Sequence, residues 1–254
     1  MQIYIKTPDQ IDLMRQSGHL LAQVHAELHQ ALRPGMSTLD IDTLGEKLIR
    51  KMGGIPNCKG YEGFPASICI SINEEVVHGI PRADRILQEG DIVTFDTGLI
   101  YKGWHSDAAR TWGVGQISPE KKQLIDVTKK SFFEGIKKAR AGNRLYEISK
   151  AVDHYVTQYG YGIVHELTGH GIGQSLHEDP NVPNYRQIRR GIKLQKGMTI
   201  CVEPMITMGK RHVGWLDDEW TVVTVDGLPA AHYENTIVIT EGEPEILTML
   251  EDEE

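Results

Sequence analysis

Cysteine is scarce in this chain, and its placement excludes two kinds of site. Of the 254 residues only Cys58, Cys69 and Cys201 are cysteines, and no two of them have the Cys-x-x-Cys spacing. An odd number at irregular spacing predicts neither a disulfide framework nor a zinc site built on thiolates. We therefore expect three reduced thiols that are mostly buried.

Long apolar runs and an excess of basic charge are also absent. No stretch approaches the roughly 20 apolar residues that a membrane-spanning helix needs, and the N-terminal segment turns polar at once, unlike a secretory signal. The net charge is −8. Most nucleic-acid-binding surfaces instead concentrate basic residues to neutralise phosphates. We expect a cytoplasmic protein with neither a membrane nor a nucleic-acid partner, and an acidic end at 251–254 that is frayed.

What the chain does contain is 40% apolar residues, enough for a large core, and predicted elements whose order occurs twice. Capping residues around a proline at 7–10 start the first helix, and glycine follows most of the expected helix ends. We expect helices at 7–32, at 37–53, from 118 to shortly before 142, and at 145–160. Strand-like segments fill 54–114 and follow the fourth helix.

A shift of 107 residues aligns the two rounds of this pattern. The matched pairs are Arg33 and Arg140, Gly35 and Gly142, Ile41 and Ile148, Gly53 and Gly160, Leu87 and Leu194, and Gly90 and Gly197. The period is too long for a solenoid. We expect one domain, 1–254, of the α/β (α+β) class. Its halves, about 7–114 and 115–245, are predicted to pack about a pseudo-twofold, with one central, mostly antiparallel sheet covered by helices and a cleft at the junction.

Two aspartates fall in a stretch that reads as a β-hairpin. Residues 91–100 are rich in β-branched and aromatic side chains, Tyr101-Lys102-Gly103 supplies a turn, and 105–114 runs back. A turn centred between Tyr101 and Lys102 makes Asp96 and Asp107 a directly opposed pair, in which like charges repel. A shared proton, an arginine or a metal ion would compensate the repulsion.

The repeat adds further acids to this pair. The shift carries Asp96 onto Glu203, and Glu234 lies on a later strand as Asp107 does. Four carboxylates would repel strongly in a cleft unless cations neutralise them. The glycine-rich segment 167–180 adds His170 and His177, without a P-loop or dinucleotide pattern. One imidazole with four carboxylates suits two ions of Mn, Fe or Co, with Zn as a further option, and such pairs hydrolyse amides or phosphoesters.

The local motifs around these residues resemble those of the type I methionine aminopeptidases. They are Asp96, Asp107, His170 in Thr-Gly-His-Gly-Ile-Gly, Glu203 in Val-Glu-Pro, Glu234 in Tyr-Glu-Asn, Ser71-Ile-Asn73 and His78-Gly-Ile-Pro81. The resemblance runs from the first helix to about Thr240. It implies the pita-bread fold and a catalytic domain that removes the initiator methionine from nascent proteins and peptides.

The resemblance also implies a role for each residue. Asp96 would bind one divalent metal ion and His170 the other, with Asp107 and Glu234 bridging them. Glu203 would be both a ligand and the proton shuttle. A metal-bridging hydroxide would attack the first peptide carbonyl, His177 would stabilise the oxyanion, and His78 would contact the scissile amide. A monovalent cation, Na or K, is expected in the loop of Asn73 and Glu75 near Ala230, as in some relatives.

The family's methionine pocket maps onto an apolar, sulfur-rich set of residues that suits a flexible thioether. The set is Cys58, Tyr61, Phe64, Cys69, Leu176 and Trp220. Three positions depart from common members: Leu176 replaces an aromatic, Phe64 a tyrosine and Glu62 a histidine. These departures affect the pocket's shape and its tolerance of the second substrate residue, not the metal ligands.

Two other classes of protein have the same fold and are alternative interpretations of the sequence. An Xaa-Pro aminopeptidase or prolidase has the same five ligands, but those relatives usually carry a large extra N-terminal domain, whereas few residues precede the first helix here. A non-catalytic binding protein of the same fold would be expected to have lost metal ligands, and all five are present. We expect a monomer that acts on N-terminal methionine of nascent chains, with transient proximity to the ribosome.

Overall fold

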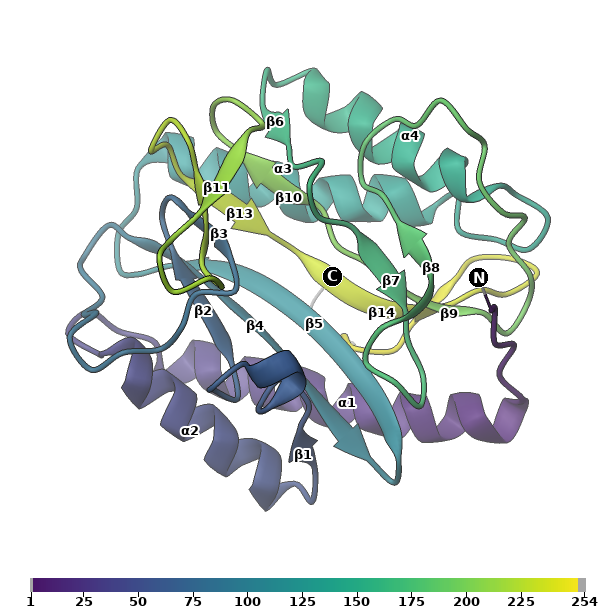
Figure 1. Ribbon diagram of the computed structural model, residues 1–254, viewed down its shortest axis with the longest axis horizontal. Helices are drawn as coiled ribbons and strands as arrows, with labels where there is room; N and C mark the ends of the chain where they lie inside the picture. The colour runs from purple at the N-terminus through teal and green to yellow at the C-terminus, as the bar shows by residue number, and fades with distance from the viewer. Residues whose placement is uncertain (1, 251–254) are drawn as a thin grey trace.

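The computed structural model describes residues 2–250, so the expected fraying of 251–254 lies outside the described residues. A nine-stranded sheet crosses the centre of the molecule (Figure 1), and each pairing within it is antiparallel. Its main path is β1 (Ile55–Pro56), β4 (Ile92–Tyr101), β5 (Trp104–Gly113), β14 (Glu234–Val238), β9 (Thr199–Val202), β7 (Gly169–Gly171) and β8 (Glu178–Val182). β2 (Cys69–Ile72) pairs with β4, and β15 (Glu245–Ile246) pairs with β14.

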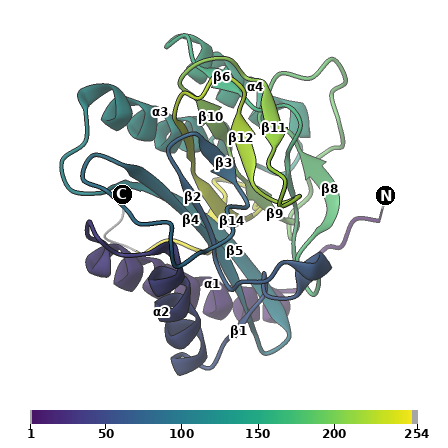
Figure 2. The same cartoon turned by 60° about the vertical axis from the view of Figure 1, so that its left-hand side comes forward.

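Two three-stranded sheets complete the β structure of residues 2–250. One consists of β13 (Ala230–His232), β10 (Met205–Thr207) and β6 (Gly162–Ile163), and the other of β11 (Val213–Trp215), β12 (Val222–Thr224) and β3 (Glu75–Val77). They lie beside one another when the molecule is turned (Figure 2). A short 3-10 turn, η1 (Tyr61–Gly63), precedes β2.

In the described part of the chain, four α-helices lie outside the central strands. In Figure 1, α1 (Pro8–Ala31) and α2 (Thr38–Lys51) run below the sheet, and α3 (Pro119–Ile136) and α4 (Leu145–Thr157) lie above it. Thr7 and Ser37 form capping boxes with Gln10 and Asp40, so local chemistry sets the first two helix starts. None of these helices, within residues 2–250, is long and apolar enough to cross a lipid bilayer. The expected α/β class with a central antiparallel sheet is confirmed.

Each pair of helices has its own core, and the two cores use equivalent residues. Ile41, Val93 and Phe95 pack in one cluster, and Ile148, Ile200 and Val202 occupy the positions 107 residues later in another. In these two clusters the apolar stripes are buried against strands of their own half. Met14 of α1 and Ile92 of β4 instead pack in clusters formed mainly by residues of the other half.

The backbone contacts at the helix connections follow the same shift. Gly35 N–H donates to Leu87 O at 2.9 Å, and Gly142 N–H donates to Leu194 O at 3.0 Å. Gly35 and Gly142 have φ of 87° and 94°, a left-handed conformation that glycine adopts without steric cost. These matched glycines therefore reflect the same turn made twice.

The β4–β5 hairpin corrects one expectation. Its register pairs Tyr101 with Trp104, so the turn is Lys102-Gly103, with φ of 50° and 82°. Asp96 consequently lies opposite Ala109, and Asp107 lies opposite Gly98. The expectation of a directly opposed pair was wrong. Because the displacement is two residues, both aspartates still project from the same face, as diagonal neighbours.

The N-terminal segment is fastened to β8 by a buried ion pair. Lys6 Nζ lies 2.5 Å from Glu178 Oε2, with side-chain exposures of 4% and 7%. Burial lowers the pKa of Lys6, while the partner carboxylate opposes that shift. Glu178 directly follows His177, so this pair also holds the loop that carries His177.

Lys6→Met is therefore expected to lower the free energy of unfolding by about 3 kcal/mol, because it leaves a buried carboxylate without its partner. Urea denaturation measures the change. The matched control is Lys122→Met, whose pair with Asp126 is exposed and should contribute less than about 1 kcal/mol. An equal decrease in the free energy of unfolding in the two variants would contradict the larger contribution of the buried ion pair.

Candidate metal centre

Five consecutive strands of the central sheet bring the predicted ligands together. In the order β4, β5, β14, β9 and β7 they carry Asp96, Asp107, Glu234, Glu203 and His170, with Glu203 directly after the end of β9. Neighbouring strands lie about 4.8 Å apart, so side chains from adjacent strands on one face meet. The sheet order thus explains why residues from 96 to 234 share one site.

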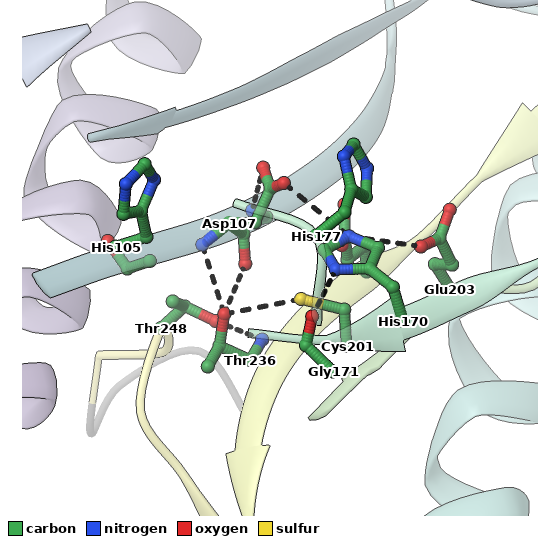
Figure 3. Close-up of polar contacts among 12 residues, drawn as sticks. His105, Asp107, His170, Gly171, His177, Cys201, Glu203, Thr236 and Thr248 are labelled. Atoms are coloured by element: carbon green, nitrogen blue, oxygen red, sulfur yellow. Dashed lines mark hydrogen bonds and ion pairs between the residues drawn. The ribbon is translucent and has the colours of Figure 1, made fainter. Parts of the chain in front are cut away.

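His170 contacts three of the four acids, and its contacts with Asp107 and Glu203 are drawn in Figure 3. Its Nε2 is 3.8 Å from Asp107 Oδ2, 3.7 Å from Glu203 Oε1 and 4.0 Å from Glu234 Oε1. Atoms that each lie about 2.0–2.2 Å from one shared ion have separations of this order. Asp96, Asp107 and Glu234 form a second group, in which the candidate ligand atoms all lie within 4.8 Å of one another. The geometry fits two adjacent metal ions.

Hydrogen bonds fix the orientation of two of these groups. His170 Nδ1 lies 2.8 Å from Gly171 O, and donation to that carbonyl leaves Nε2 free of its proton and directed at the acids. Thr236 Oγ1 accepts from Asp107 N–H at 3.0 Å and donates to Asp107 O at 2.9 Å (Figure 3). One threonine hydroxyl therefore holds both backbone groups of Asp107.

The acids carry an electrostatic cost in the absence of cations. Burial raises the pKa of Asp107, Glu203 and Glu234 well above the ordinary values, and neighbouring carboxylates raise those of Asp107 and Glu234 further. Burial also raises the pKa of Asp96 to about 6. Glu234 Oε1 is buried without a hydrogen-bond partner among residues 2–250. Divalent cations would remove both the repulsion and this unsatisfied oxygen.

The metal-free protein is expected to lose stability as the pH rises from 6.5 to 8. In that window the folded site retains protons that carboxyls of the unfolded chain, with pKa near 4, have already released. Each proton that the folded site holds and the unfolded chain has released lowers the free energy of unfolding by about 1.4 kcal/mol per pH unit. Below pH 6.5 the effect is opposed, because burial lowers the pKa of His25 and His170 to about 3 and of His78 and His232 to about 4.

Urea unfolding after chelation, at pH 6.5 and at pH 8, measures this dependence. Metal binding displaces the retained protons, so the loaded protein should lack the decline and its metal affinity should rise with pH. A metal-free protein that gains stability between pH 6.5 and 8 would contradict the raised carboxyl pKa values.

A cavity of about 190 Å³ opens beside the acids. Its walls include the five predicted ligands, His78 and His177, and the full predicted methionine pocket of Cys58, Tyr61, Phe64, Cys69, Leu176 and Trp220. Phe64 and Trp220 meet edge to face, with ring centroids 5.2 Å apart. Cys69 in β2 lies directly opposite Asp96 in β4, so this apolar space adjoins the acid cluster.

Two histidines flank the cavity. The rings of His177 and His170 have centroids 4.2 Å apart, and His177 Nδ1 lies 2.7 Å from the hydroxyl of Tyr61. Donation by Tyr61 leaves His177 Nε2 to carry the ring proton. His78 has φ of 58°, a conformation uncommon outside glycine. The rings of His78 and Trp220 are nearly perpendicular, with centroids 6.3 Å apart.

The sequence-based prediction missed some residues of the site. His232 forms a potential ligand group with Glu203 and Glu234, and Val77, Leu167, Thr168 and Met205 also line the cavity. The spacing His-x-Glu in 232–234 was a usable signal for His232, because alternate residues of extended chain share a face. No local pattern marks the others.

Comparisons with known proteins show which family the whole chain resembles. Residues 12–241 match the model of metallopeptidase family M24. The methionine aminopeptidase of Clostridium acetobutylicum is 51% identical over 98% of this chain and 100% of its own length. The crystal structure of methionine aminopeptidase from Thermotoga maritima has a TM-score of 0.95 and 40% identity, covering 98% of this chain and 100% of that chain.

The Xaa-Pro dipeptidase of Bacillus anthracis is a more distant structural match. It has a TM-score of 0.78 and 25% identity, and it covers 98% of this chain but 63% of that chain. Together these matches confirm the pita-bread fold. The chain is more similar to the methionine aminopeptidases than to the Xaa-Pro dipeptidase.

Proposed function

Since the chain belongs to metallopeptidase family M24, we propose that it is a metalloaminopeptidase that removes the N-terminal methionine from nascent proteins and peptides. The observation that carries this proposal is a cavity with two contrasting walls. One wall is the cluster of four acids and His170, and the other is apolar and sulfur-rich. The identity of 51% with a methionine aminopeptidase over nearly the full chain supports it.

The acid cluster would hold two divalent ions of Co, Mn, Fe or Zn. Asp96 would bind one ion, His170 and Glu203 the other, and Asp107 and Glu234 both. When bound, such ions supply a water of low pKa and polarise a peptide carbonyl. The oxygen-rich ligand set favours Mn, Fe and Co, with selection among them dependent on metal availability.

Side chains of the protein then transfer protons and stabilise the negative charge that develops on the substrate oxygen. Glu203 accepts the proton of the attacking water and delivers it to the leaving amine, a task for which a carboxylate in a water-poor site is suited. His177, held by Tyr61, donates from Nε2 to the developing oxyanion. His78 contacts the amide of the scissile bond.

The methionine side chain would occupy the space between Cys58, Cys69, Phe64 and Trp220. The sulfur atoms and aromatic edges there favour a thioether. Leu176 and Glu62 also line the cavity, so these departures from common members bear directly on substrate choice. Leu176 leaves more room than an aromatic ring, and Glu62 places a carboxyl group at the cavity.

We further propose that Na or K binds at the loop of Asn73 and Glu75. Ala230 N–H donates to Asn73 O at 2.8 Å, which brings that strand against the loop. The ammonium of Lys121 already occupies Asn73 Oδ1 at 3.0 Å, so the ion would bind through backbone carbonyls of the loop and not through this side chain. A melting temperature that is unchanged when tetramethylammonium replaces Na and K would count against this site.

The remaining proposals concern organisation and partners. The chain is a single catalytic domain with repeat halves of about 7–114 and 115–245, supported by the equivalent glycine turns. We propose a cytoplasmic monomer whose partners are the N-terminal methionines of nascent chains, met close to the ribosome.

A peptide panel distinguishes this function from the Xaa-Pro alternative. Met-Ala-Ser should release methionine at least about 100-fold faster, in kcat/KM, than Leu-Ala-Ser releases leucine, because a pocket shaped for one side chain discriminates by a few kcal/mol. Met-Pro-Ser and Ala-Pro-Ser test the second specificity. Preference for Ala-Pro-Ser over Met-Ala-Ser would overturn the proposal, and so would the absence of any hydrolysis by the metal-loaded protein.

A further inference from the structure

His232 is a buried imidazole beside the metal centre that the proposed mechanism does not use. Its side chain is 1% exposed, and its Nε2 lies 3.6 Å from Glu203 Oε2. Neither ring nitrogen has a hydrogen-bond partner among residues 2–250. A buried polar group without a partner is unusual in a folded protein and calls for an explanation.

The backbone fixes this imidazole against Glu203. His232 ends β13 and pairs with Met205 of β10, and the next residue, Tyr233, donates its N–H to Pro204 O at 3.2 Å. The chain just after Glu203 and the chain around His232 therefore run side by side. The proximity of the two side chains follows from the strand pairing.

A residue of β5 also holds the backbone of His232 by two hydrogen bonds. Thr111 Oγ1 accepts from His232 N–H at 2.9 Å and donates to His232 O at 2.9 Å. Thr236 holds the backbone of Asp107 in the same manner. The backbone at His232 is thus held as firmly as that of a predicted metal ligand, which suits a residue whose ring must keep one orientation.

The two oxygens of Glu203 face different histidines. Oε1 lies 3.7 Å from His170 Nε2, and Oε2 lies 3.6 Å from His232 Nε2. His170 uses Nδ1 on a backbone carbonyl and directs Nε2 at the acids, as a ligand does. His232 has no such contact on Nδ1. Its Nε2 is placed to donate to the Glu203 oxygen that faces away from His170.

We propose that His232 is a positioning residue for Glu203. A shift of a few tenths of an ångström from the observed 3.6 Å lets its Nε2–H donate to Glu203 Oε2, and this bond holds the carboxylate so that Oε1 stays directed at the ion shared with His170. The proposal rests on the proposed function, because it gives Glu203 its role as ligand and proton shuttle. Partners that orient a ligand typically change metal affinity or activity by about 10 to 100-fold.

Two nearly isosteric replacements separate hydrogen bonding from packing. His232→Gln keeps an N–H donor, whereas His232→Met has similar length without one. We expect isothermal titration of the metal-free protein with Mn²⁺ to show about 10 to 100-fold weaker binding in His232→Met. His232→Gln should remain within about threefold of the wild type. The exposed His212→Gln serves as a control and should match the wild type.

Kinetics add a second measurement. With Met-Ala-Ser and saturating Mn²⁺, His232→Met should lower kcat by about tenfold or more and leave KM within about threefold, because a misdirected Glu203 impairs proton transfer rather than substrate binding. His232→Gln should recover most of kcat. Equal Mn²⁺ affinity in all variants would overturn the proposal, and so would a His232→Gln variant as impaired as His232→Met.

Proton NMR of the Co²⁺-loaded protein tests whether His232 is itself a ligand. Ring N–H signals of coordinated histidines are strongly shifted by the ion. The proposal predicts the same number of strongly shifted ring N–H signals in the wild type and in His232→Gln. Loss of one such signal in His232→Gln would make His232 a ligand and overturn the positioning role.

Failure of the proposed function would look different. A wild-type protein that binds Mn²⁺ but releases no methionine would contradict the aminopeptidase proposal. The difference in Mn²⁺ affinity between His232→Gln and His232→Met would still decide the role of His232. Thermal unfolding of each metal-free variant identifies any loss of affinity caused by a failure to fold.

Discussion

Replacing Glu203 by glutamine is expected to reduce kcat for Met-Ala-Ser by about 10³-fold. Glutamine keeps the size of the side chain and one oxygen, but it cannot take up a proton near neutral pH. A positioned general acid or base contributes about 10² to 10⁴ in rate, and Glu203 is asked to serve as both. Steady-state assays at saturating Mn²⁺ measure the change.

Metal content must be determined on the same samples, because Glu203 is also a proposed ligand. If Glu203→Gln retains both ions and turns over within a few fold of the wild type, the assigned proton shuttle is wrong. If kcat falls while both ions remain bound, the loss lies in proton transfer.

The second large effect is expected from Asp107→Asn. Asp107, like Glu234, belongs to both candidate ligand groups, through its contact with His170 and its place in the group of Asp96 and Glu234. An amide loses the negative charge and one anionic ligand atom, so we expect the metal content after dialysis to fall from two ions per chain to at most one. Methionine release should fall by about 10³-fold. A two-ion site activates a water molecule and polarises the substrate carbonyl, and both functions depend on a carboxylate that binds both ions.

Asp42→Asn is the matched control for a buried aspartate. Asp42 accepts from the backbone N–H groups of Ser67 and Ile68 and lies outside the cavity lining. It should lose stability but keep both ions. Two ions in Asp107→Asn, measured by plasma mass spectrometry, would contradict the bridging assignment.

Local sequence was sufficient wherever local chemistry sets the structure. The capping boxes at Thr7 and Ser37 define helix starts through bonds within four residues, and both starts were predicted correctly. The glycine matches were equally informative, because left-handed turns such as those at Gly35 and Gly142 favour that residue.

The hairpin register was harder to predict. Lys102 and Gly103 both adopt positive φ in a two-residue turn, a conformation that the sequence Tyr-Lys-Gly does not specify uniquely. The centre of the turn was therefore misplaced by one residue, and the partner of Asp96 by two. The alternation of side chains nevertheless kept Asp96 and Asp107 on one face.

The contacts within the site could not be predicted from the sequence, because they depend on pairing between strands that are far apart in the chain. The acids were found through the repeat and the family motifs, but their contacts depend on a sheet order that joins β5 to β14 and β14 to β9. His232 contacts Glu203 because β13 pairs with β10. No periodicity within either segment encodes that pairing, so the structure was needed to find it.

The most direct test of this account is a titration of the metal-free protein with Mn²⁺ at pH 7.5, with methionine released from Met-Ala-Ser measured at each addition. The account predicts no release after chelation, and release that grows with bound Mn²⁺ and levels off at no more than two ions per chain. Full release by the chelated protein, or none at two bound ions, would contradict it.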